Sequence, residues 1–437
     1  MIAKANPCAI HTPTRWTRAR VLQRRLYSSA KADPMRRYGN LYDKVCRADV
    51  LWEAWRRVSR NGGSAGVDGV SIEWIREYGV AKYLKELGTL LRAKRYRPDR
   101  IKRVYIPKPD GRQRPLGIPT VTDRVVQMAV KIVIEPLFEA DFADCSYGFR
   151  PRRSAHQAIG KIDECLRRGF RYVVDVDLKS YFDTIPHDRL MERVERRVQD
   201  RQVLRLIRWW LKAGIMEDGE VHYPELGSPQ GGVLSPLLSN IYLHEVDRQW
   251  CRRGAKTHMV RYADDLVILC GTEKDAQEEY RRLQTTLNEL KLILNETKTR
   301  VVRASTGFDF LGFSFRRGVY RRSGRTREII IKVPRAKARQ GVRDRIKATI
   351  RALPLGEPIR TAVRAVNVRL GGWANYFRIS NVRPALTQLV DYACVELRLF
   401  LRRRYQRKSR QDVRRFPPDY FHQRHGLYTV PQLLYGS

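Results

Sequence analysis

Two adjacent aspartates, Asp264 and Asp265, stand inside the apolar segment RYADDLVILC, whose pattern predicts a strand or a hairpin. Unpaired charges are costly to bury, and neighbouring like charges also repel each other. The pair therefore requires a fold that brings a cation or a polar opening to this segment. In the upstream segment VVDVDLKSYFD, strand alternation places Asp175 and Asp177 on one face. Two such strands side by side would gather carboxylate oxygens, the ligands that Mg²⁺ prefers.

The charge of the chain predicts its class of partner. Its 437 residues include 86 Lys and Arg but only 46 Asp and Glu, a formal net charge of +40. This excess indicates a polyanion, with nucleic acid ahead of a membrane surface. No apolar run is long enough for a transmembrane helix. The 7 cysteines form no CxxC pair, which argues against a zinc knuckle or a disulfide framework and favours a reduced, intracellular protein.

Hydrophobic periodicity predicts a mixed α and β region followed by a basic helical region. The elements expected in the first region are helices over 42–58, 123–138, 234–250 and 273–294, a strand–turn–strand over 102–120 and a strand over 171–178. Residues 316–437 carry 29 Lys and Arg against 7 Asp and Glu. Helices are expected there over 342–352, 358–377 and 384–406.

Three sequence motifs in combination resemble those of a known family. YADD lies between apolar residues, DVDLKSYFD lies upstream, and GSPQGGVLSPLLSN separates them. With these words the chain resembles a reverse transcriptase, and more closely the reverse transcriptase/maturase encoded by bacterial group II introns. The resemblance extends from residue 40 to residue 400. It implies an α+β, right-hand polymerase with fingers, palm and thumb, the thumb being an α-helical basic maturase domain.

The resemblance implies a catalytic centre with two Mg²⁺ ions, Mn²⁺ being the alternative. Its ligands would be Asp177, Asp264, Asp265 and the backbone carbonyl of Leu178. Asp177 is chosen over Asp175 because the family's ligand precedes an aromatic residue by five positions. That aromatic is Phe182, which would close off the sugar 2′ position and so select deoxynucleotides.

The resemblance also implies contacts to substrate. Lys108 and Arg114 would hold the triphosphate, and Gln230 would lie beside the sugar and base of the incoming nucleotide. Lys298 belongs to a closing palm motif, and Arg150 and Arg153 either touch template or pack structurally. The basic run at Arg402, Arg403 and Arg404 is either a nucleic-acid contact or a solvated helix end, and the whole-chain charge favours contact. Trp373 lies in the most recognisable thumb word, where helical spacing favours a core position over stacking on RNA.

The domain boundaries that follow are a basic N-terminal arm over 1–40, an N-terminal extension and fingers over 41–165, the palm over 166–330, the thumb/maturase domain over 331–400 and a basic C-terminal tail over 401–437, a DNA-binding candidate. Residues 1–32 lack acids, which also fits a targeting peptide, but the arm is preferred because the rest of the chain is equally basic. No HNH endonuclease is expected, because His422 and His425 have no CxxC pairs around them.

The function implied is RNA-directed DNA polymerisation together with maturase activity in intron splicing and mobility. The partners would be intron RNA, an RNA template/DNA primer duplex, target DNA and deoxynucleoside triphosphates, in the bacterial cytoplasm and without a membrane. Two alternatives stay open: a splicing-only maturase, which the intact acids oppose, and a reverse transcriptase of this family adopted by its host. The sequence does not fix the oligomeric state.

Overall fold

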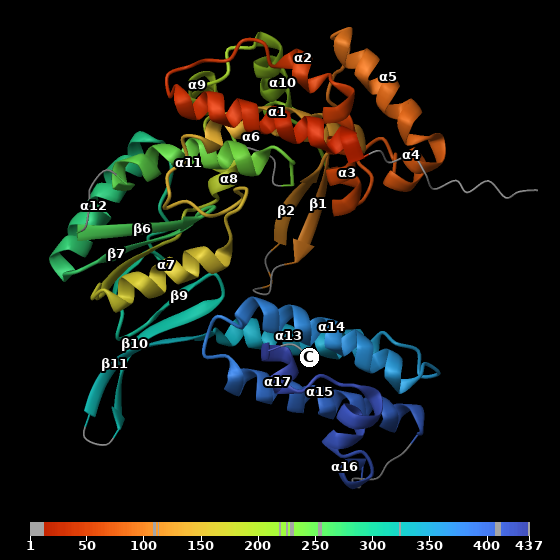
Figure 1. Ribbon diagram of the computed structural model, residues 1–437, viewed down its shortest axis with the longest axis vertical. Helices are drawn as coiled ribbons and strands as arrows, with labels where there is room; N and C mark the ends of the chain where they lie inside the picture. The colour runs from red at the N-terminus through yellow and green to blue at the C-terminus, as the bar shows by residue number, and fades with distance from the viewer. Residues whose placement is uncertain are drawn as a thin grey trace, which may run out of the picture.

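The computed structural model describes residues 13–107, 111, 113–217, 220–223, 226–227, 231–251, 256–322, 325–406 and 412–435. They form three regions that follow one another along the chain (Figure 1). An N-terminal, mainly helical region corresponds to the fingers. A central sheet with its covering helices corresponds to the palm, and a C-terminal helical bundle corresponds to the thumb.

The fingers region is built on the buried helix α6. Its helices are α1 (Pro13–Ala32), α2 (Tyr42–Val45), α3 (Ala48–Asn61), α4 (Ile72–Tyr78), α5 (Val80–Arg92) and α6 (Val121–Glu139). The side chain of Thr120 caps α6 by accepting a hydrogen bond from the backbone N–H of Asp123. The helix expected over 42–58 is broken at Cys46–Arg47 into α2 and α3, but its predicted apolar face is buried.

The segment expected as a basic arm is, from Pro13 onward, mostly a packed helix. Helix α1 lies against α6 and α3, and it buries Ala19, Leu22, Leu26 and Ala30. Hydrogen bonds from the side chains of α1 to backbone carbonyls of α6 and of the residue that follows it tie the two helices together. The arginines of this segment therefore occupy the outer side of a helix that belongs to the fingers core.

A small sheet links the fingers to the palm. Its strand order is β2-β1-β4-β5, with β1 (Ile101–Pro107), β2 (Gln113–Ile118), β4 (Ile215–Glu217) and β5 (Glu220–His222). Strands β1 and β2 form the antiparallel hairpin predicted over 102–120. The parallel pairing of β1 with β4 was not predicted, and it joins this hairpin to the chain that follows the palm helix at residues 201–211.

The palm sheet has the strand order β6-β7-β3-β8, and every neighbouring pair is antiparallel. Its strands are β3 (Tyr172–Val176), β6 (Thr257–Tyr262), β7 (Asp265–Cys270) and β8 (Arg300–Arg303). Helices α11 (Ser235–Cys251) and α12 (Glu273–Glu289) cover one face, and α7 (Ala155–Arg167) covers the other. The sheet therefore separates two hydrophobic cores.

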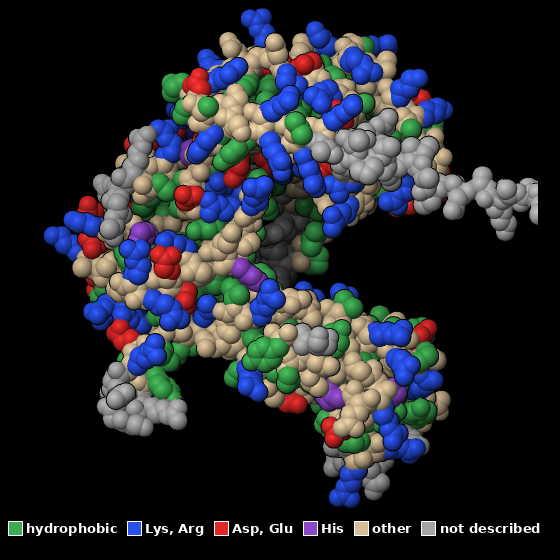
Figure 2. Space-filling model, in the orientation of Figure 1, with side chains coloured by type: hydrophobic (Ala, Val, Ile, Leu, Met, Phe, Trp, Pro, Cys, Tyr) green, Lys and Arg blue, Asp and Glu red, His purple; other side chains and the backbone are tan. Residues whose placement is uncertain are grey.

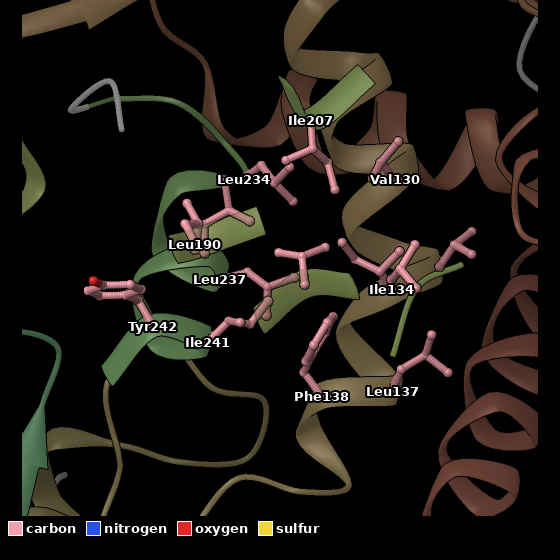
Figure 3. Packing of buried hydrophobic residues seen from close by; sticks show 14 of the residues in the cluster. Val130, Ile134, Leu137, Phe138, Leu190, Ile207, Leu234, Leu237, Ile241 and Tyr242 are labelled. Carbon is pink, nitrogen blue, oxygen red and sulfur yellow. The ribbon is translucent and has the colours of Figure 1, made fainter. Parts of the chain in front are cut away.

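The larger core also holds the palm to the fingers. Helices α8 (Tyr181–Thr184), α9 (His187–Glu195) and α10 (Arg201–Leu211) precede α11 in the chain. Figure 3 shows side chains of α9, α10 and α11 packed against Val130, Ile134 and Phe138 of α6. All of these labelled side chains are buried, so the palm helices and α6 form one continuous apolar interior.

A third sheet leads from the palm to the thumb. It contains β9 (Phe308–Phe310), β10 (Phe313–Arg322) and β11 (Arg325–Pro334), and the β10–β11 hairpin projects from the body of the protein (Figure 1). The thumb helices α13 (Ala336–Arg351), α14 (Ile359–Phe377) and α15 (Arg383–Arg404) confirm the three helices that were predicted. Trp373 is 6% exposed and packs in the thumb core, as its spacing predicted.

The end of the chain is not a free tail where the structure describes it. Residues 412–435 form α16 (Asp412–Arg415), a π-helical turn (Tyr420–Arg424) and α17 (Val430–Tyr435). These elements contact α14 and α15, and they bury Phe416, Phe421, Leu427 and Leu433. The thumb core therefore continues past the boundary expected at residue 400.

Candidate active site

The three predicted acids meet at one end of the palm sheet. Tyr262 pairs with Asp265, so β6 and β7 are joined by the two-residue turn Ala263–Asp264, with Ala263 in the left-handed region at a φ of 58°. Strand β3 pairs with β7 in a register that ends with Val176 opposite Leu266. The next residue in that register is Asp177, which comes opposite Asp265. Two segments far apart in sequence thus bring their carboxylates to the same end of adjacent strands.

The acids also share one face of the sheet. Val174 and Val176 belong to the core under α11 and α12, whereas Val173 belongs to the core under α7. Alternation along β3 therefore places Asp175 and Asp177 on the α7 face, as the sequence predicted. By the same alternation along β7, Asp265 lies on that face too.

This concentration of carboxylates changes their protonation. Withdrawal from water, followed by the charges of Asp264, Asp177 and Asp175, raises the pKa of Asp265 to about 6. Desolvation raises the pKa of Asp175 as well, and the neighbouring Arg300 guanidinium opposes that rise. Burial is the larger cause of both pKa shifts, and the neighbouring carboxylates add to it. A bound cation would offset their negative charge.

Asp177 is held by the segment that follows α12. Its Oδ2 accepts a hydrogen bond from Asn295 Nδ2 at 2.8 Å and forms an ion pair with Lys298 Nζ at 2.9 Å. Lys298, predicted as a nucleic-acid contact, therefore pairs with a predicted catalytic acid in this structure. Its side chain is 58% exposed, so water screens the ion pair and Lys298 can leave at little cost. Asn295 was not predicted, although it lies in the same motif, LNETKTR.

The backbone around Leu178 pairs with the segment that follows α12. The N–H of Lys179 donates to the carbonyl of Ile293, and the N–H of Asn295 donates to the carbonyl of Asp177. In an antiparallel pair, groups on alternate residues point to opposite sides. The carbonyl of Leu178 is therefore turned away from residues 293–295 and toward the side of β7.

The chemistry of this site fits a divalent oxygen-binding metal, although the acids do not form a closed cage. Among the described residues, no group of three or more His, Cys, Asp or Glu side chains is already gathered around a metal position. Mg²⁺ usually keeps several waters and takes one or two carboxylates together with substrate phosphates. An open set of Asp177, Asp264, Asp265 and the Leu178 carbonyl suits that preference.

The predicted nucleotide loop lies against protein backbone at two points. A Cβ on Gly227 would lie 2.8 Å from the carbonyl oxygen of Phe182, and one on Gly231 would lie 2.4 Å from that of Gly117. Both glycines have positive φ angles, of 90° and 111°. The loop thus contacts both α8, which carries Phe182, and the β1–β2 hairpin. Phe182 is half-buried and meets Tyr181 edge to face, with ring centroids 5.4 Å apart.

Other predicted nucleotide contacts are only partly described. Arg114 lies on β2 opposite Ile106, and its backbone alone is described. Lys108 and Gln230 lie outside the described residues.

The structure favours the packing alternative for Arg150. Its side chain is 3% exposed and pairs with Glu139 at 2.8 Å. The same guanidinium also donates to the backbone carbonyls of Ala143 and Ser146, at 2.5 and 2.7 Å. Arg153 pairs with Asp144 and keeps a side chain that is 28% exposed. Of these two arginines, Arg153 is therefore the one placed to reach a template.

The basic run at the end of α15 is divided in its contacts. Arg404 donates to the backbone carbonyl of Glu357 and is half-buried. Arg403 is exposed, and its Nε donates to the carbonyl of Leu399 within its own helix. Arg402 is half-buried. The run therefore serves both as a helix end and as a charged surface.

A wide opening separates the thumb from the fingers and palm. Figure 2 shows this opening, with Lys and Arg side chains gathered along its upper border. Positive charge around an opening of this kind attracts a nucleic acid backbone.

Comparison with known proteins supports the same assignment. Residues 106–315 match the family model described as "Reverse transcriptase (RNA-dependent DNA polymerase)", and residues 339–416 match "Group II intron, maturase-specific domain". Protein YkfC of Escherichia coli (strain K12) is 36% identical over 359 residues, which cover 73% of this chain and 93% of YkfC. Group II intron-encoded protein LtrA of Lactococcus lactis subsp. cremoris is 32% identical over 365 residues, covering 67% of this chain and 59% of LtrA.

A yeast relative extends the comparison. The putative COX1/OXI3 intron 1 protein of Saccharomyces cerevisiae is 29% identical over 329 residues, covering 63% of this chain and 39% of that protein. The chain thus spans nearly all of YkfC but less than two thirds of the two intron proteins. Both domain matches lie in the regions that carry the acids and the basic helices. The chain belongs to the family of group II intron-encoded reverse transcriptases/maturases.

Proposed function

We propose that this reverse transcriptase/maturase copies RNA into DNA at the end of the palm sheet by a two-metal mechanism. Asp177, Asp264, Asp265 and the carbonyl of Leu178 would be the metal ligands. The observation that carries the proposal is the pairing of Val176 with Leu266, one residue before Asp177 on the first strand and one residue after Asp265 on the second, beside the turn that holds Asp264. The raised pKa of Asp265 supports it, because burial and then the charges of Asp264, Asp177 and Asp175 disfavour an unpaired carboxylate there.

The protein's own groups would position the reactants. Bound Mg²⁺ ions would activate the primer 3′-hydroxyl and stabilise the pyrophosphate as it leaves. Asp177 would exchange Lys298 for the metal, which frees the Lys298 ammonium for phosphate oxygens. Phe182, held by Tyr181 and by the Gly227 loop, would lie against the sugar and exclude a 2′-hydroxyl. The substrates would be deoxynucleoside triphosphates on an RNA template/DNA primer duplex.

The charge distribution supports intron RNA and target DNA as the larger partners. The net charge is +40, and basic side chains border the opening that Figure 2 shows. A relative is named as intron-encoded, and a maturase-specific domain covers the thumb. No described helix is long and apolar enough to cross a membrane. We propose a bacterial cytoplasmic protein that binds its intron RNA through the basic thumb.

Primer extension on an RNA template tests the catalytic assignment. Asp264→Asn and Asp177→Asn should each abolish DNA synthesis in Mg²⁺ while RNA binding, measured by filter retention, stays near that of the unmodified protein. Asp175→Asn is the matched control. It removes a carboxylate from the same face of the same strand, but Asp175 pairs with Arg300 at 3.5 Å and is not assigned to the metal.

Three outcomes separate the alternatives. Loss of synthesis in the first two variants alone supports the assignment. If Asp175→Asn loses DNA synthesis and Asp177→Asn retains it, Asp175 rather than Asp177 is the metal ligand. If the unmodified protein binds and splices its intron RNA but extends no primer, the splicing-only alternative holds.

A further inference from the structure

A buried arginine lies directly beneath the catalytic turn. Arg261, on β6, is 0% exposed, and so is its partner Asp247 on α11. Arg261 Nε donates to Asp247 Oδ1 at 2.7 Å, and Nη2 donates to Oδ2 at 2.5 Å. A charge this deep in a protein must be paired and hydrogen-bonded to be tolerated. The pair fixes the plane of the guanidinium relative to α11.

The remaining donors of Arg261 reach three different segments. Nη1 donates to the backbone carbonyl of Ala263 at 2.8 Å and to Asn240 Oδ1 at 3.0 Å. Nη2 also donates to Ser146 Oγ at 2.7 Å. Together with Asp247, these acceptors use all five N–H groups of the guanidinium. One side chain thereby joins α11, the loop at residues 145–148 and the turn that carries Asp264.

The loop at residues 145–148 holds the same turn from its other side. The N–H of Tyr147 donates to the carbonyl of Arg261, and the N–H of Arg261 donates to the carbonyl of Cys145, both at 2.8 Å. Asn240 Nδ2 donates to the carbonyl of Gly148 at 2.8 Å. Gly148 lies so close to the turn that a Cβ on it would come within 2.3 Å of the backbone nitrogen of Ala263.

We propose that Arg261 is a positioning residue that sets the place of the Asp264 carboxylate by holding the carbonyl of Ala263. The proposal rests on the proposed function, because it assumes that Asp264 binds metal. A peptide bond connects Ala263 to Asp264, so movement of that carbonyl moves the start of the acidic pair. Lysine keeps the charge but offers one nitrogen, and it cannot hold Asp247, Asn240 and Ala263 together.

The fold supplies a matched control. Arg197 is also buried, with a side chain that is 3% exposed, and it too forms a bidentate pair, with Asp141. Its other donors reach the backbone carbonyls of Ala30, Asp33 and Arg36 at the end of α1. Arg197→Lys therefore disrupts an equally connected arginine whose hydrogen bonds go to segments away from the palm turn.

The experiment maps the metal site with Fe²⁺ in the presence of ascorbate and hydrogen peroxide. Bound Fe²⁺ reduces the peroxide to hydroxide and a hydroxyl radical that cuts the nearby backbone, and ascorbate returns Fe³⁺ to Fe²⁺. It uses the full chain with an RNA template and DNA primer bound. The Fe²⁺ concentration for half-maximal cutting near residues 177 and 264 is measured with the melting temperature of each variant. Arg261→Lys should raise that concentration about tenfold or more, the usual effect of losing a group that orients a metal ligand. Arg197→Lys should lower the melting temperature but leave the half-maximal concentration unchanged.

Each result decides between positioning and packing. If Arg261→Lys reaches half-maximal cutting at the same Fe²⁺ concentration as the unmodified protein, the proposal is wrong. If Arg261→Lys does not fold, Ser146→Ala takes its place, because it removes one acceptor and leaves the Asp247 pair intact. A raised Fe²⁺ requirement in Ser146→Ala then supports the proposal, and an unchanged one overturns it. Asp264→Asn tests the metal-binding role of Asp264 separately from the positioning role of Arg261. Unchanged cutting in that variant would refute the metal assignment itself.

Discussion

Adding one methyl group at Gly148 should displace the catalytic turn without touching any acid. A Cβ at this position would lie 2.3 Å from the nitrogen of Ala263 and 2.9 Å from the carbonyl carbon of Tyr262. Ordinary contact begins at 3.4 Å, so the two segments must separate by about 1 Å. Backbone atoms on both sides leave no flexible side chain to absorb that shift. Gly148→Ala is therefore a geometric change to the active site.

A misplacement of about 1 Å costs on the order of 100-fold in rate, which corresponds to about 2.7 kcal/mol of lost transition-state stabilisation. We expect kcat for single-nucleotide addition to fall by that factor while the Kd for template/primer changes little. Rapid-quench measurement of one addition in saturating deoxynucleotide provides the rate. Gly160→Ala is the control, because Gly160 lies exposed on α7 with open space around its Cα. It should raise stability by up to about 1 kcal/mol and leave kcat unchanged.

Gly148→Ala could still fold in a different way, so circular dichroism and the melting temperature accompany the kinetics. A folded variant with an unmodified kcat would refute the reasoning, because it would mean that the turn tolerates a 1 Å shift. A reduced rate in both glycine variants would indicate a general effect of the substitution rather than a local one.

Further expectations concern the acids, the sugar and the basic surface. The pKa of Asp265 is raised from 3.8 to about 6, so between these pH values the folded, metal-free protein holds a proton that the unfolded chain releases. The melting temperature should therefore fall as the pH rises from 4 to 6, and Asp265→Asn should reduce that fall. Phe182→Ala should admit ribonucleotides more readily in primer extension, and unchanged discrimination would make Phe182 a packing residue. Replacing Arg402 and Arg403 with Gln should flatten the log–log salt dependence of RNA binding by about 0.7 for each phosphate that the protein no longer neutralises, whereas an unchanged slope would mean a solvated helix end.

The elements that sequence predicted well are those whose signal is local. Helices α6, α14 and α15 follow from an apolar stripe of period 3.6. The side-chain alternation that predicted Asp175 and Asp177 on one face is present in β3, which pairs with β7. The motif words located the acids, because each word is short and its residues act close to one another. The α+β class and the helical thumb followed from these signals.

The features that sequence missed or left open depend on distant partners. Arg150 looks like any exposed arginine until Glu139 and the carbonyls of its own loop surround it. Lys298 meets Asp177 only because the segment after α12 returns beside β3. Helix α1 carried a usable signal, the spacing of Ala19, Leu22 and Leu26, but its high positive charge suggested a basic arm instead.

The hydrogen-bond network around Arg261 could not be predicted from sequence either, because its members lie in distant segments of the chain. The arginine stands in the quoted segment RYADD, yet its acceptors come from α11 and from the loop at residues 145–148. Nothing in the spacing of Ser146 or Asp247 points to a shared partner. Such partners emerge only once three-dimensional packing brings their segments together.

The order of strands in the palm sheet also sets an order of events during synthesis. Strand β3 lies in the middle of the sheet, but both of its neighbours, β7 and β8, come much later in the chain. Chains emerge from the ribosome from the N-terminus at about 5–20 residues per second. Asp177 must therefore wait for several seconds beside an unpaired strand edge before Asp265 arrives. The fingers helices, which precede β3 in the chain, are the part of the nascent protein available to shield that edge.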